Sequence, residues 1–78
     1  MPTVLRVGPY RFFFFASDRN EPPHIHVKRD DAAAKFWLLP VRLAWNAEFP
    51  LHEIRKVRKI VQQHEQTFVE AWHESFGN

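Results

Sequence analysis

Hydrophobic and polar residues alternate through the first half of the chain, a pattern typical of short β-strands. Turn segments such as Gly8-Pro9 and Asp30-Asp31-Ala32 separate the alternating stretches. We expect strands over Thr3–Val7, Tyr10–Ala16, His24–Arg29 and Ala34–Leu39, and a short strand or extended connector over Val41–Trp45. The run Phe12-Phe13-Phe14-Phe15 in the second strand is apolar on both faces, so we expect it to be central or covered on both sides.

The second half of the chain has a different period. Its apolar positions step by three or four residues, as on one face of an α-helix, at Ile54, Val57, Val61, His64, Phe68, Trp72 and Phe76. Pro50 suits the start of this helix and Gly77 its end. We therefore predict a single α+β domain over residues 1–78: a small antiparallel sheet of four to five strands with one long C-terminal helix packed on one face.

The alternation also predicts how the third and fourth strands pair. If His26 lies opposite Lys35 and His24 opposite Trp37, the apolar residues of both strands share the face toward the helix. A shift of one residue would mix the two faces. The helix-facing residues are then Ile25, Val27, Phe36 and Leu38. The opposite, open face carries His24, His26, Lys28, Lys35 and Trp37.

Composition limits the kinds of site, the cellular location and the partners that we expect. The 78 residues include no cysteine, which excludes disulfides and thiolate metal sites. No run approaches the roughly 20 apolar residues of a membrane span, and the N-terminus lacks a signal-peptide pattern, so we expect a cytoplasmic protein without a membrane partner. The net charge of +2 does not by itself indicate nucleic acid. Twelve aromatic residues either fill a small core or form an interaction surface.

The segment Glu21-Pro22-Pro23-His24-Ile25-His26-Val27 has the most distinctive chemistry. Its prolines favour extended backbone, so a strand begins at a defined point with two imidazoles on one face beside Lys28. Such a group can hold a metal, transfer protons or contact phosphate. A metal site needs a third ligand. The other candidates lie out of obvious reach, so we expect no metal and no cofactor: His52, His64, His73 and Glu74.

Three functions fit an open face of this composition. Aromatic side chains with lysines can bind unpaired nucleic acid, and Phe13 or Phe15 would add to Trp37. An aromatic face can also dock a partner protein or a second copy of the chain. Alternatively, His24 and His26 with Lys28 are the minimum equipment for metal-independent RNA cleavage by general acid–base catalysis.

The basic cluster of the predicted helix lies early in it and consists of Arg55, Lys56, Arg58 and Lys59. Acidic residues lie late in the helix, and this order opposes the helix dipole. Within that cluster Arg55, Lys56 and Lys59 share one exposed side, whereas Arg58 flanks the apolar stripe. These three residues are candidates for phosphate binding. The alternative is an ordinary solvated surface.

Most of the chain resembles a bacterial family of small uncharacterised proteins, domain of unknown function 4160. The resemblance runs from Pro2 to Gly77 and is most specific in the Glu-Pro-Pro-His-Ile-His segment. The matching motif positions are Glu21, Pro22, Pro23, His24, His26, Lys35, Trp37, Trp72 and His73. Leu39, where the family favours an acid, and Pro50, where a capping Ser is common, depart from the pattern.

The resemblance implies a gene pair of the toxin–antitoxin kind, with a small partner protein encoded by the neighbouring gene. We predict that this chain is the binding component of such a module and docks a partner protein or nucleic acid. The alternative is a metal-independent endoribonuclease toxin using His24 and His26. The predicted binding residues are Glu21, His24, His26, Lys28, Lys35, Trp37, Arg55, Lys56 and Lys59.

Overall fold

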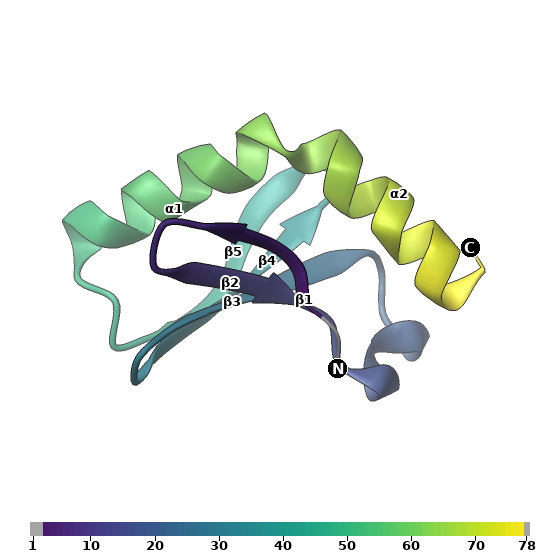
Figure 1. The fold of residues 1–78 in the computed structure, drawn as a ribbon, viewed down its shortest axis with the longest axis horizontal. Coiled ribbons are helices and arrows are strands. Elements are labelled where there is room, and N and C mark those ends of the chain that lie inside the picture. The colour runs from purple at the N-terminus through teal and green to yellow at the C-terminus, as the bar shows by residue number, and fades with distance from the viewer. Residues whose placement is uncertain (1–2, 78) are drawn as a thin grey trace.

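The computed structural model describes residues 3–77, so Met1, Pro2 and Asn78 at the ends of the predicted domain lie outside the described residues. Five strands form one antiparallel sheet in chain order, and two helices arch over one of its faces (Figure 1). This confirms the predicted α+β class. The strands are β1 (Thr3–Val7), β2 (Tyr10–Phe13), β3 (His24–Arg29), β4 (Ala32–Leu38) and β5 (Val41–Ala47). The helices are the 3₁₀-helix η1 (Ala16–Asn20), α1 (Leu51–Gln63) and α2 (Glu65–Phe76).

The predicted register between β3 and β4 is confirmed. His24 pairs with Trp37, and His26 pairs with Lys35. The apolar residues of both strands are completely buried in the core beneath the helices: Ile25, Val27, Phe36 and Leu38. Alternation has period two, so burial of this one face fixes the pairing.

The predicted single long helix is divided at His64. The backbone there leaves helical geometry, with φ −112° and ψ 18°. Its N–H still bonds to the carbonyls of Ile60 at 3.1 Å and Val61 at 3.2 Å. The apolar stripe continues across the break, so Val57 in α1 and Trp72 in α2 are both fully buried. The division changes the direction of the helix without moving the stripe off the sheet (Figure 1).

The segment after β2 also differs from the expected strand over Tyr10–Ala16. The strand ends at Phe13, and the chain turns into η1. The turn is closed by two hydrogen bonds: Asp18 N–H donates to the Phe15 carbonyl at 3.1 Å, and Phe15 N–H donates to Asp18 Oδ2 at 2.8 Å. A short polar side chain that bonds to nearby backbone in this way competes with strand pairing.

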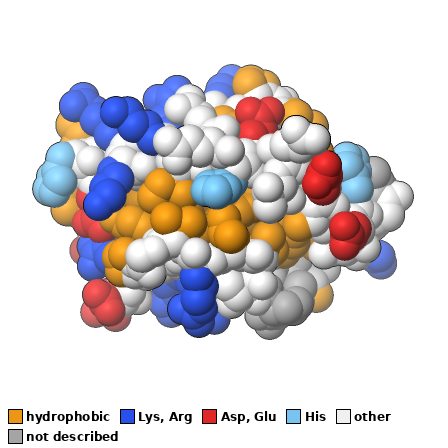
Figure 2. Space-filling model, turned by 45° about the horizontal axis from the view of Figure 1, so that its top comes forward, with side chains coloured by type: hydrophobic (Ala, Val, Ile, Leu, Met, Phe, Trp, Pro, Cys, Tyr) orange, Lys and Arg blue, Asp and Glu red, His pale blue; other side chains and the backbone are white. Residues whose placement is uncertain are grey.

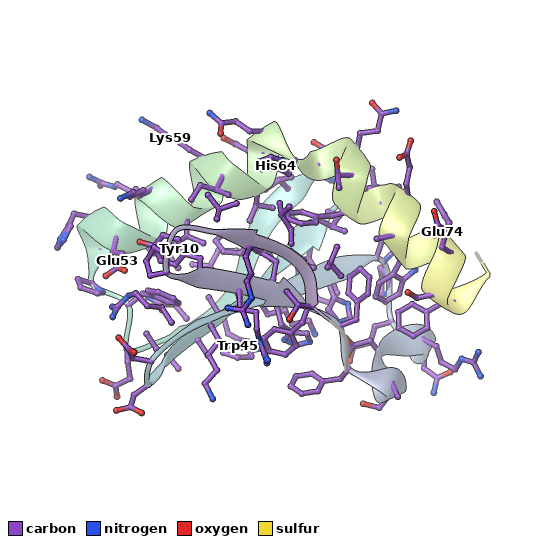
Figure 3. The ribbon with its side chains drawn as sticks, viewed as in Figure 1. Tyr10, Trp45, Glu53, Lys59, His64 and Glu74 are labelled. Atoms are coloured by element: carbon purple, nitrogen blue, oxygen red, sulfur yellow. The ribbon has the colours of Figure 1, made fainter. Side chains whose placement is uncertain are left out.

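A side-chain cluster connects the start of α1 to the sheet (Figure 3). Glu53 accepts two hydrogen bonds from one edge of the Arg29 guanidinium, at Nε and Nη2, and a third from the Tyr10 hydroxyl at 2.8 Å. The Arg29 contact holds the pKa of the Glu53 carboxyl below its usual range.

Neither α1 nor α2 has the length and apolar character to cross a membrane.

Candidate functional site

Three titratable side chains are buried together where η1 packs against the start of β3. His24 is fully buried, and Asp18 and His26 are each 7% exposed. Strand alternation places the two imidazoles on one side of β3, and the turn of η1 brings Asp18 back to them. One donor atom from each residue lies within 4.8 Å of the other two.

The Asp18 carboxylate is held in place by its own backbone neighbours. Its Oδ2 accepts the Phe15 N–H at 2.8 Å, and its carbonyl accepts the Glu21 N–H at 3.0 Å. From this position Oδ2 lies 3.1 Å from the Nε2 of His24 and 3.2 Å from the Nε2 of His26. One carboxylate oxygen therefore contacts both imidazoles.

His24 has one satisfied nitrogen and one that lacks a partner. Its Nδ1 lies 2.9 Å from the Pro22 carbonyl oxygen, which can only accept, so Nδ1 carries the proton of the neutral ring. The Nε2 atom then presents a lone pair. Although Nε2 is close to Asp18, the contact is misaligned, and this buried nitrogen has no hydrogen-bond partner among residues 3–77.

His26 has a longer contact with the same carboxylate. Its Nε2 lies 3.4 Å from Asp18 Oδ1, and its ring stacks on Phe13 with centroids 5.6 Å apart. The edge of Phe15 also meets this ring, at 4.6 Å. Burial lowers the pKa of His26, although the nearby Asp18 carboxylate acts in the opposite direction. This favours the neutral imidazole, the form that can accept a proton or bind a metal.

The expectation of an open face is wrong at both histidines. The ring of His24 lies 5.0 Å from that of Trp72 in α2 and 5.6 Å from that of Trp37, so it is enclosed from two sides. Phe13 at the end of β2, Phe15 in the turn that follows and Asp18 of η1 cover His26. The register placed the histidines on the predicted side of β3, but the loop after β2 and the end of α2 close over them.

The rest of that side of the sheet carries cations and aromatic rings. We call it the outer face: the side chains of the strands that point away from the helices, chiefly Arg6, Arg11, Phe13, Lys28, Lys35, Trp37, Arg42 and Trp45. Trp45 is 44% exposed and lies on the side of the sheet opposite α1 (Figure 3). Lys35 pairs with Glu21, and its ammonium lies 4.5 Å from the centre of the Trp37 ring.

Two hollows occur beside the outer face. One of about 300 Å³ is lined mainly by basic residues: Arg6, Pro9, Arg11, Lys28, Arg29 and Asp30. The other, of about 350 Å³, is lined by the prolines before β3 and by residues around the β4–β5 turn: Pro22, Pro23, Trp37, Leu39, Pro40 and Arg42. The first can accept an anion, and the second presents an aromatic wall beside a guanidinium.

The basic cluster of α1 lies apart from the outer face. Arg55, Lys56 and Lys59 are exposed on the helix that covers the inner side of the sheet, and Lys59 points away from the strands (Figure 3). Basic side chains gather over the α1 end and acidic ones toward the α2 end (Figure 2). The structure therefore does not combine these three residues with Lys35 and Trp37 into one surface.

Sequence reasoning overlooked Asp18 and half of the outer face. None of the predicted site residues lies between Ala16 and Glu21, and the candidates for a third metal ligand were all on the predicted helix. The sequence does hold one signal for Asp18. Pro22 and Pro23 lead the chain from η1 directly into β3, which leaves Asp18 beside the start of that strand. Arg6 and Arg11 follow from the alternation in β1 and β2.

A family model described as "Domain of unknown function (DUF4160)" matches residues 10–73. This match covers β2 through most of α2 and includes Asp18, both histidines and most of the outer face. Comparisons with curated proteins and with solved structures give no match.

Proposed function

The chain belongs to the DUF4160 family, a family of unknown function, and from this premise we propose that it is the nucleic-acid-binding component of a bacterial, cytoplasmic two-protein module of the toxin–antitoxin kind. The outer face is the proposed docking surface for single-stranded nucleic acid. A small protein encoded by the neighbouring gene is the proposed partner.

A row of like charges across three strands carries this proposal. Arg6 pairs with Arg11 across β1 and β2, and Arg11 pairs with Lys28 across β2 and β3. Like charges directly opposite each other destabilise a sheet. Three aligned cations next to a basic hollow therefore suit a surface that binds a polyanion, because phosphates would remove the repulsion.

The exposed aromatic residues favour single strands over duplex. Trp45 is 44% exposed and Phe15 is 47% exposed, and both belong to the same side of the molecule as the charge row. Flat rings at a sheet surface stack on bases, which requires bases that are unpaired. Lys35 and Arg42 flank Trp37 and Trp45 and add further contacts for phosphate.

A pair of triple variants tests the proposal, with binding of fluorescent single-stranded RNA and DNA measured over a range of salt concentrations. Arg6→Gln/Arg11→Gln/Lys28→Gln should weaken binding and reduce the slope of log affinity against log salt by about 0.7 for each lost contact. Arg55→Gln/Lys56→Gln/Lys59→Gln removes the same charge from α1 and should leave the slope unchanged. Equal effects of the two variants would contradict docking on the outer face.

Base stacking is tested separately. Trp45→Ala should weaken binding of single strands by about 1–3 kcal/mol if one base stacks on this ring. Binding to a duplex of the same sequence should change much less. If the wild type binds no nucleic acid but binds the neighbouring gene product through Trp45, the face is a protein interface.

The ribonuclease alternative is supported by one contact, that of Asp18 with His26. It predicts RNA fragments in the presence of chelator and their loss, by about 100-fold or more, in His26→Ala. Induced expression of the chain with and without its neighbour assigns the biological role. Growth arrest that the neighbour relieves would identify this chain as the toxin.

A further inference from the structure

We propose that Asp18, His24 and His26 bind a divalent first-row transition metal ion, with Zn²⁺ the best match, and that this ion links η1 to β3. This site is independent of the proposed nucleic-acid binding, which uses the exposed outer face. Asp18 supplies the third protein ligand that a metal site needs.

The spacing of the donor atoms fits a small tetrahedral ion. Bond lengths of about 2.0–2.2 Å to nitrogen or oxygen separate neighbouring ligand atoms by about 3.4 Å. Asp18 Oδ2 lies 3.1 Å from His24 Nε2 and 3.2 Å from His26 Nε2, and all three donors lie within 4.8 Å of one another. A modest rotation of one ring would complete three corners of the tetrahedron.

The unpartnered nitrogen of His24 is the second observation. This Nε2 is fully buried, presents a lone pair toward the carboxylate and has no hydrogen-bond partner among the described residues. A buried polar atom without a partner is costly. A single proton could bridge only one nitrogen–oxygen pair, whereas a cation at the common centre would satisfy all three donors.

The atoms behind the donors are arranged as they are around known metal ligands. Ligating histidines usually donate their other ring N–H to a carbonyl or carboxylate, and ligating carboxylates accept a further hydrogen bond. Here His24 Nδ1–H donates to the Pro22 carbonyl, and Asp18 accepts the Phe15 N–H. These bonds fix the orientation of two of the three ligands before any ion binds.

The donor set also selects the class of metal. Two imidazoles and one carboxylate suit zinc and its neighbours in the first row, whereas Ca²⁺ and Mg²⁺ prefer oxygen ligands. Three protein ligands leave a fourth position for water. In so small a domain, an ion joining a loop to a central strand would add stability that a limited core does not provide.

The test uses full-length protein stripped with chelator and then titrated with Zn²⁺, with heat of binding and thermal unfolding recorded. The wild type should bind one ion and unfold at a higher temperature when loaded. Asp18→Asn and His26→Ala should each weaken binding by about 100-fold or more, because loss of an outer partner alone costs 10–100-fold. Circular dichroism of the stripped variants shows whether they are folded. His24 is not substituted, because it is fully buried.

The matched control is His52→Ala/His73→Ala, which removes two exposed histidines outside the cluster. It should bind Zn²⁺ as tightly as the wild type. Co²⁺ provides a direct readout, because its visible absorption should appear in the wild type and the control and be lost in His26→Ala. The proposal fails if the wild type binds no ion, if folded cluster variants bind as tightly, or if the control loses binding.

Discussion

The two ends of the sheet each hold a carboxylate in a partly enclosed site, and the two are satisfied differently. Glu53 accepts hydrogen bonds from two N–H groups on one edge of the Arg29 guanidinium and from the Tyr10 hydroxyl, with separations of 2.9 Å at Nη2 and 2.8 Å at the hydroxyl. Asp18 accepts one backbone N–H in good geometry. Its other contacts are two imidazole nitrogens, one misaligned and one at the limit of a hydrogen bond.

The difference separates a structural cluster from a candidate binding site. Arginine is always charged and presents a planar fork that matches a carboxylate, so the Glu53 cluster is complete without any further group. The two imidazole nitrogens meet Asp18 less well, because neither contact is a well-aligned hydrogen bond of normal length. The molecule therefore fixes α1 with a closed ion pair and leaves the η1 end with donors that suit a cation.

The largest effect that would test this comparison is expected from Asp18→Ala in chelator-treated protein. The substitution leaves the Phe15 N–H without its side-chain acceptor, and a hydrogen bond to a charged group contributes about 1.5–3 kcal/mol. We expect the free energy of unfolding to fall by that amount in denaturant titrations. A loss much below 1 kcal/mol would show that the carboxylate is not held as the structure has it.

A smaller loss is expected from Glu53→Gln, because the pair with Arg29 is partly exposed to water, which screens it, and Gln keeps an oxygen that can accept from the guanidinium. The matched control is Asp30→Asn, whose exposed carboxylate meets the same guanidinium at 3.2 Å. The control should be nearly neutral in the same titrations. If Glu53→Gln lowers the free energy of unfolding more than Asp18→Ala does, the Glu53 cluster contributes more to stability than the Asp18 turn, contrary to the expected order.

The Glu53 cluster also predicts a pH dependence. Because Arg29 lowers the pKa of Glu53 in the folded state, the unfolded state binds protons more readily as the solution is acidified. The stability from this group should be complete above the ordinary carboxyl pKa of about 4.3 and be lost as the pH falls through the folded value. Denaturation at several pH values should show the gap between wild type and Glu53→Gln closing in acid. A gap that persists below the folded value would contradict the assignment.

The smallest effect is expected from Arg55→Gln/Lys56→Gln/Lys59→Gln on α1. Their side chains are exposed, so stability should change by less than about 0.5 kcal/mol for each. Thermal unfolding at low and high salt measures this. A large, salt-sensitive change would show that α1 takes part in the electrostatics of the two ends.

The sheet and its core could be predicted because their signals are local and repetitive. Alternation over a few residues fixed which side of β3 carries His24 and His26, and matching apolar faces fixed the register with β4. The helix stripe was equally readable, although its spacing passes through His64 without marking the break. A stripe reports which face is buried and is insensitive to a local change of backbone direction.

By itself, then, the sequence determined the α+β class, the strand order along the chain, the inner core and the side on which the histidines lie. Tertiary structure decided that these histidines are buried, that Asp18 meets them and that the α1 cations lie on the other side of the sheet. Periodicity specifies faces, because it depends on neighbours in the chain. The meeting of Asp18 with His24 depends on one turn closed by the Phe15 N–H and on the packing of Trp72, which are contacts between residues with no shared pattern.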